Sequence, residues 1–167
     1  FVIGRDTRES GESIERAFCG GAYAGGAHCV SAGVITTPGV AFLARVEGFD
    51  AGIVISASHN PFYDNGIKVF LPSGKKIEEA IERQTERDIY GSADDQMPLG
   101  SEAEIEYAAD LIDHYIAHLT GSVAGLSAAG IKIVLDCANG AASSIAPRVF
   151  GSLGADVIAI HDRPDGR

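Results

Sequence analysis

The sequence predicts an α/β fold, with a mixed sheet sandwiched between helices and a partial second α/β unit after it. Two observations lead to this prediction. Short runs of apolar, β-branched residues alternate along the chain with segments whose apolar residues recur at helical spacing. The same strand–helix–strand order then starts again near residue 131, after a stretch rich in Gly, Ser and Ala.

The composition sets limits on what the protein does. A chain of 167 residues with 46% hydrophobic residues can bury one core and part of another. A formal net charge of −10 argues against a nucleic-acid partner, which requires a basic surface. We find no signal peptide or apolar run of membrane-spanning length, so no membrane partner is expected. Because the chain starts at Phe1 and stops just after a strand–helix–strand segment, we expect it to be a piece of a longer protein.

The cysteines indicate a compartment. The chain has three of them, an odd number without metal-ligand spacing: Cys19, Cys29 and Cys137. We expect reduced core residues of a cytoplasmic protein.

The first strand is predicted at residues 1–4, and the turn after it carries Arg5 and Arg8. Two guanidinium groups at a strand end suit a bound phosphate or carboxylate. The alternative is a surface ion pair with a neighbouring acid. Ser10 is the expected N-cap of the helix that follows.

The next elements lead to the centre of the sheet. A second strand is predicted at 28–32. Thr37 is expected to cap a helix that starts at Pro38 and runs to about Glu47, because proline is tolerated in a first helical turn. The buried strand at 51–56 is then the central one.

A polar loop follows this central strand. Residues 56–66 combine Ser, His, Asn, Pro, Asp and Gly, and residues 67–70 return as a strand. Open α/β sheets bind ligands where such strands end, although a polar loop is also a common solvated turn. The loop and the returning strand offer Ser58, His59, Asn60 and Lys68.

The remaining helices complete the first unit and lead to the second. A charged helix is predicted at 77–90, a polar linker at 91–100, and a second helix at 102–119 with an apolar seam. We therefore divide the chain into a first domain at 1–120, a linker at 121–130 and a partial domain at 131–167. Within the last part the predicted elements are a strand at 131–136, a helix at 144–153 and a strand at 156–160.

Ser58 is the predicted centre of the loop's chemistry. A free serine needs a base, and we do not expect the adjacent His59 to face it, so no Ser-His-Asp triad is predicted. A phosphorylated serine instead needs donors and cations around it, which Lys68, His59, Arg5 and Arg8 offer. Ser56 is expected to remain in the strand, whereas Ser58 lies two residues further on, in the loop.

These motifs resemble a known family. Ser56-Ala-Ser-His-Asn-Pro61, followed by Asp64-Asn-Gly-Ile-Lys68, resembles the phosphoserine loop of the α-D-phosphohexomutases. Its residues are most similar to those of the branch that acts on glucosamine phosphates. The turn from Gly4 to Gly11, Thr37-Pro38 and the segment Asp136 to Gly140 resemble further motifs of that family, in the family's order.

The resemblance implies a mechanism. A phosphoserine gives its phosphate to a phosphosugar, the bisphosphate reorients, and the enzyme takes back the other phosphate. Ser58 is then the phosphate carrier, His59 and Lys68 are catalytic, and Arg5, Arg8 and Asn60 bind substrate or phosphate. A Mg²⁺ ion is implied, with Ser58 as a ligand through its phosphate and the other ligands outside this chain.

The same resemblance implies a biological setting. The expected reaction interconverts glucosamine 6-phosphate and glucosamine 1-phosphate in cytoplasmic amino-sugar and peptidoglycan precursor synthesis. The expected partners are the phosphorylated hexosamine and a second copy bound through the first domain. The chain alone is expected to be inactive.

Three alternatives stay open at this point. The first is a phosphoglucomutase or phosphomannomutase of the same superfamily. The second is a non-catalytic phosphosugar-binding or assembly module. The third is a nucleotide or methyl-donor loop at 134–140, with Asp162 beyond the next strand, although a dinucleotide fingerprint needs three glycines and this segment has one.

Overall fold

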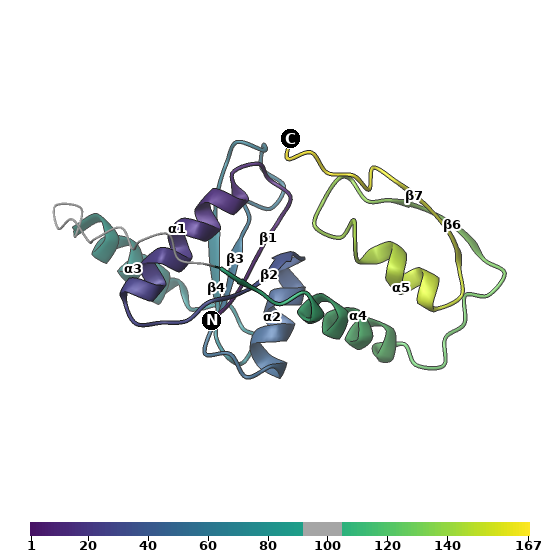
Figure 1. Cartoon of the computed structure of the whole chain (residues 1–167), viewed down its shortest axis with the longest axis horizontal. Helices are drawn as coiled ribbons and strands as arrows, with labels where there is room; N and C mark the ends of the chain where they lie inside the picture. Colours follow the sequence, from purple (N-terminus) through teal and green to yellow (C-terminus); the bar gives the residue numbers. More distant parts are fainter. Residues whose placement is uncertain (92–104) are drawn as a thin grey trace.

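The computed structural model describes residues 1–91 and 105–167 (Figure 1). The predicted α/β class is confirmed. In chain order the elements are β1 (Val2–Arg5), α1 (Gly11–Ala24), β2 (Val30–Val34), α2 (Thr37–Val46), β3 (Gly52–Ile55), β4 (Ile67–Phe70), α3 (Glu79–Gly91), β5 (Glu106–Tyr107), α4 (Asp110–Ser122), β6 (Lys132–Asp136), α5 (Ala146–Ser152) and β7 (Asp156–Ile160).

The first unit is built on a mixed sheet with the strand order β4-β3-β1-β2-β5. The β3–β4 pair is antiparallel, and the other strand pairs of this sheet are parallel. Since β1 and β3 are parallel neighbours, their carboxyl ends lie at the same edge of the sheet. A hydrogen bond from the Asp6 backbone N–H to the Ile55 carbonyl, 3.0 Å long, ties the turn after β1 to the end of β3. This edge carries the loop at 56–66, as the sequence predicts.

Each face of the sheet has its own core, because successive side chains of a strand point to opposite faces. Val2 and Val54 pack on the face covered by α2 and α4, with Val40, Leu43 and Ile116. Ile3, Ile53 and Ile55 pack on the other face, in one cluster with Cys19 and Cys29 and with partly buried residues of α1. The helices therefore enclose the central strands from both sides (Figure 1).

The cysteines are buried and free. Cys19 and Cys29 are inaccessible to solvent, and burial raises the pKa of the Cys19 thiol to about 12. A thiol with so high a pKa stays protonated at neutral pH, which fits the expectation of reduced core residues.

The start of α2 corrects one prediction. Thr36 caps this helix, not Thr37. Thr36 has an extended backbone, and its hydroxyl oxygen accepts a hydrogen bond from the Gly39 N–H at 3.3 Å. Pro38 lies in the first turn as expected.

Ser10 is at the N-cap position of α1, as predicted. Its backbone is already helical, however, and its side chain makes no capping hydrogen bond. Its hydroxyl instead donates to the Asn65 side-chain oxygen.

The predicted helix at 102–119 is wrong in its first part. Glu106 and Tyr107 form the edge strand β5 and pair with Val30 and Ser31 of β2, and α4 begins only at Asp110. Pairing with a neighbouring strand overrides the helical periodicity of the sequence here. Residues 102–104 of that prediction, and nearly all of the polar linker at 91–100, lie outside the described residues.

The second unit follows the predicted strand–helix–strand order. β6 and β7 pair in parallel from Lys132–Asp156 to Asp136–Ile160. Ile145, just before α5, is 3% exposed and joins the core between α2 and α4. α4 ends at Ser122, inside the predicted linker at 121–130, and β6 begins at Lys132, after it; the division into domains there stays a prediction. Among the described residues no helix is long and apolar enough to cross a membrane.

Candidate functional site

A cavity of about 610 Å³ lies at the carboxyl edge of the sheet, between the two units. Residues far apart in the sequence line it together. They come from the turn after β1, the start of α2, the loop at 56–66, the loop after β6 and residues 166–167, and include Asp6, Thr7, Arg8, Thr36, Thr37, Pro38, Ser58, His59, Asn60, Ala138, Asn139, Gly140 and Arg167. Five segments therefore converge on one cavity.

Ser58 lies exposed at this cavity, and its backbone is strained. Its φ is 59°, in the left-handed region that residues other than glycine seldom adopt. The Ser58 backbone N–H donates to the Ser56 hydroxyl oxygen at 3.0 Å. Ser56 itself is 7% exposed, and its N–H donates to the Gly66 carbonyl at 2.8 Å, which closes the base of the loop. The loop thus buries Ser56 and presents Ser58.

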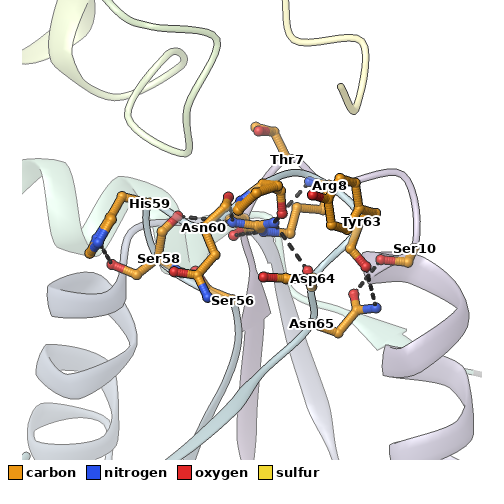
Figure 2. Close-up of polar contacts among 12 residues, drawn as sticks. Thr7, Arg8, Ser10, Ser56, Ser58, His59, Asn60, Tyr63, Asp64 and Asn65 are labelled. Atoms are coloured by element: carbon orange, nitrogen blue, oxygen red, sulfur yellow. Dashed lines mark hydrogen bonds and ion pairs between the residues drawn. The ribbon is translucent and has the colours of Figure 1, made fainter.

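His59 contacts its neighbour, contrary to expectation. The Ser58 hydroxyl oxygen and His59 Nδ1 are 3.4 Å apart (Figure 2). The left-handed turn at Ser58 brings the two adjacent side chains to the same side, which a strand would not do. The contact is long for a hydrogen bond, so it defines a neighbour of the hydroxyl group rather than a strongly bound base.

The Arg8 guanidinium group lies inside the curve of the loop (Figure 2). Its Nε donates to the Asp6 carboxylate at 3.0 Å. Its two terminal nitrogens donate to backbone carbonyls of the loop: Ser58 at 3.0 Å, Asn60 at 2.9 Å, Asp64 at 3.0 Å, and Pro61. The sequence predicts that Arg8 binds a phosphate. In the structure Arg8 instead binds backbone carbonyls of the loop that carries Ser58.

Arg5 points to a different partner. Its Nε donates to the Glu15 carboxylate at 3.0 Å, and Glu15 is inaccessible to solvent. The other Glu15 oxygen accepts from the Ser31 hydroxyl. Arg5 is not among the described residues that line the cavity. Its predicted role in binding phosphate stays a prediction, while its observed contacts join β1, α1 and β2.

Lys68 and Asn60 differ in position. Lys68 lies directly opposite Val54 in the antiparallel β3–β4 pair, but it is not among the described residues that line the cavity, so its catalytic role stays a prediction. Asn60 lines the cavity with Ser58, and its N–H donates to the Ala57 carbonyl at 3.2 Å.

The loop after β6 closes the cavity from the second unit. Asp136 accepts a hydrogen bond from the Ala138 backbone N–H at 2.9 Å and pairs with the His161 imidazole at 3.0 Å. The Ala138 N–H, and then His161, lower the pKa of the Asp136 carboxyl. The Thr7 hydroxyl donates to the Asn139 carbonyl at 2.8 Å and so joins the two units directly.

Sequence reasoning missed Thr7 and Asn139. Asn139-Gly140 is a recognisable turn dipeptide, but no local pattern indicates that its carbonyl meets a hydroxyl group 132 residues away.

The described residues do not form a metal site by themselves. They contain no group of three or more His, Cys, Asp or Glu side chains placed to hold an ion. Asp6, the acid that lines the cavity, has both oxygens engaged by Arg8, one by its backbone N–H at 3.1 Å and one by Nε.

The sheet between helices, with the Ser58 loop at its carboxyl edge, is that of an α/β protein that binds a ligand where its strands end. The chain belongs to the phosphoglucomutase/phosphomannomutase family, whose α/β/α domain I matches residues 1–95. The segment 134–140, the alternative nucleotide or methyl-donor loop, lies outside the residues that this family model matches.

Curated relatives agree with this family. The chain is 46% identical to a phosphoglucosamine mutase of Moorella thermoacetica over 167 residues, which covers 99% of this chain and 37% of the relative. It is also 46% identical to one of Desulforamulus reducens, covering 99% and 38%. The chain therefore spans little more than a third of the length of these relatives.

Solved structures share the fold. A phosphoglucomutase/phosphomannomutase family protein of Burkholderia thailandensis superposes with a TM-score of 0.74 at 27% identity, covering 99% of this chain and 36% of the other. A structure from Thermus thermophilus superposes with a TM-score of 0.80 at 24% identity, covering 99% and 38%.

Proposed function

We propose that this chain provides the phosphate-carrying part of a mutase that interconverts glucosamine 6-phosphate and glucosamine 1-phosphate. The observation that carries the proposal is Ser58: an exposed residue with left-handed backbone, in the first part of the loop that lines the cavity.

The proposed reaction has two phosphoryl transfers. The free sugar hydroxyl of the monophosphate attacks the phosphorus on Ser58. The bond from phosphorus to Ser58 Oγ breaks, a bond to the sugar oxygen forms, and the hydroxyl proton leaves to a base. The sugar bisphosphate then reorients in the site, and Ser58 Oγ accepts the phosphoryl group that was on the original monophosphate. Such transfers depend mainly on positioning and charge stabilisation.

The surroundings of Ser58 support this chemistry. A phosphoserine carries about −1.5 to −2 charges at pH 7. The amino-terminal end of α2, at Thr36 to Pro38, lines the same cavity, and the positive end of a helix dipole favours an anion. We assign His59 as a hydrogen-bonding group beside Oγ, and Lys68 as the cation or proton acceptor.

The choice of sugar is part of the proposal. The curated relatives at 46% identity are named phosphoglucosamine mutase, which favours glucosamine phosphate. The phosphoglucomutase or phosphomannomutase activity named for the family and for its solved members is the second candidate. With glucosamine phosphate as substrate, the setting is cytoplasmic synthesis of amino-sugar and peptidoglycan precursors.

We further propose that the intact enzyme requires Mg²⁺. A phosphate oxygen on Ser58 is a suitable hard ligand, and further oxygen ligands come from outside the described residues. A homodimer through the first unit is also proposed. It is supported by α3, which buries none of its residues and exposes Ile81, Ile89 and Tyr90.

The test compares two serines in one loop, in a protein of the relatives' length that contains this chain. Ser58→Ala should abolish both the covalent phosphate and turnover of glucosamine 6-phosphate, because it removes the acceptor oxygen. Ser56→Ala, the matched control, should keep the phosphate, since Ser56 Oγ is buried and only supports the loop. Intact mass measures the phosphate, and a coupled assay measures turnover.

Three outcomes separate the candidates. A Ser58→Ala variant that stays phosphorylated and active would overturn the proposal. Phosphosugar binding without turnover in the unmodified protein would support the non-catalytic module instead. The 167-residue chain alone should bind little substrate and show no turnover, because it provides no complete metal site among its described residues.

A further inference from the structure

We infer that Arg8 is a positioning residue that holds the Ser58 loop in shape from inside its curve, rather than a ligand of the sugar phosphate. This inference rests on the proposed role of Ser58. It changes the role that the sequence predicts for Arg8, because the contacts of its guanidinium group identify a different partner (Figure 2).

The donors of the Arg8 guanidinium group are already in use. A guanidinium group has five N–H donors and no acceptor. In this structure the five contacts of Arg8 Nε, Nη1 and Nη2 go to the Asp6 carboxylate and to the carbonyls of Ser58, Asn60, Pro61 and Asp64. The side chain is 9% exposed. A substrate phosphate could bind this group only by displacing one of the carbonyls.

The bound carbonyls give the loop its shape. Four carbonyl oxygens between residues 58 and 64 turn toward one cation, so this segment wraps around the guanidinium group. Oxygens held in this way are kept away from the phosphate on Ser58, which they would repel. The positive charge of the Arg8 guanidinium group also lies next to residues 58–64. Both effects favour a dianion at Ser58 without a direct bond from Arg8.

Arg8 is itself fixed by the sheet. Asp6 accepts from both the Arg8 backbone N–H and Nε, and the Asp6 N–H is bound to the Ile55 carbonyl at the end of β3. The loop is therefore braced against the buried strands β1 and β3. Ser10 adds a second brace through Asn65.

Lysine provides the discriminating substitution. An ammonium group carries the same charge, but its three donors share one nitrogen and cannot reach carbonyls on both sides of a planar fork. If Arg8 bound the phosphate through its charge, lysine would partly replace it. If Arg8 holds the loop through the geometry of its guanidinium group, lysine would not replace it.

The experiment has an activity arm in a protein of the relatives' length that contains this chain. Arg8→Lys and Arg8→Ala should both lower kcat by roughly 10²-fold, because a misplacement of about 1 Å has that effect, and KM for the phosphosugar should change little. Added guanidinium ion should restore part of the kcat of Arg8→Ala. Arg148→Lys on α5, which keeps the charge beside Asp113 at an exposed site, is the matched control and should leave kcat unchanged.

A second arm does not depend on activity. Hydrogen exchange in the 167-residue chain should show faster exchange of the Ser56 and Asp64 amides in Arg8→Lys, while the amides of β1 and β3 stay protected as an internal check of folding. If Arg8→Ala does not fold, Asp6→Asn weakens the same brace and should give a smaller change in both arms.

The outcomes are distinct. Retained kcat with a raised KM in Arg8→Lys, or unchanged loop exchange, would overturn the role of Arg8. Activity retained in Ser58→Ala would overturn the proposed function instead, and the exchange arm would then still decide whether Arg8 holds the loop.

Discussion

The two units of this chain use similar sequences in different surroundings. Ile53 to Ile55 of β3 are all nearly inaccessible, because helices cover both faces of the five-stranded sheet. β6 and β7 carry comparable apolar runs, yet Val134 is 64% exposed and Ile158 46% exposed. α5 covers one side of this pair, so an apolar strand is buried only where both faces have a neighbour.

The loops at the two carboxyl edges differ in the same way. The Ser58 loop is braced by a guanidinium group that is itself 9% exposed. The loop after β6 is held by Asp136 and His161, whose side chains are 57% and 61% exposed. Exposed ion pairs contribute little to stability, whereas ion pairs shielded from water fix the geometry of the loop that they hold. The precision of the site therefore comes from the first unit.

The largest expected effect contrasts two isoleucines. Ile55→Ala should lower the free energy of unfolding by about 4 kcal/mol, because it leaves a cavity at a site that is 2% exposed. Ile158→Ala, at 46% exposed, should lower it by less than about 1 kcal/mol. Urea unfolding of the chain, followed by circular dichroism, measures both. Equal losses would show that β7 is as enclosed as β3.

A smaller effect contrasts two carboxylates. Glu15→Gln should destabilise the fold by about 3 kcal/mol, because it breaks a buried ion pair and leaves Arg5 without a countercharge, although Arg5 is partly exposed. Asp113→Asn, the matched control, breaks the pair with Arg148 on α5, where both side chains are more than half exposed. Its expected loss is below about 1 kcal/mol. Thermal unfolding compares the two, and a reversed order would contradict the assignment of Glu15 as the central ion-pair partner.

The smallest effect depends on pH. The Ala138 N–H and His161 hold the pKa of Asp136 below its ordinary value of 3.8. A lowered pKa in the folded state adds stability above pH 3.8, and that stability is lost as the pH falls through the folded-state pKa. Asp136→Asn should therefore be slightly less stable than the unmodified chain at pH 6, and the difference should shrink as the pH falls through the folded-state pKa. A difference that grows toward low pH would reverse the sign and contradict the pairing.

Local sequence is sufficient for the class of fold and for the position of the central loop. The apolar runs of β1 and β3 need no context to be recognised as buried strands, and Ser56 to Gly66 has loop composition. Pro38 marks the first turn of α2 in the same way. These are properties of neighbouring residues.

The roles of the charged and capping residues depend on tertiary contacts. Arg5 and Arg8 look equivalent in the sequence, yet Arg5 pairs with Glu15 in α1 and Arg8 binds carbonyls 50 to 56 residues away. Glu106 and Tyr107 follow a helical pattern and still form a strand, because β2 offers an open edge. The physical reason is that a long, flexible side chain or a short segment pairs with whichever distant element the fold brings beside it. The residues next to it in the sequence do not indicate which element that is.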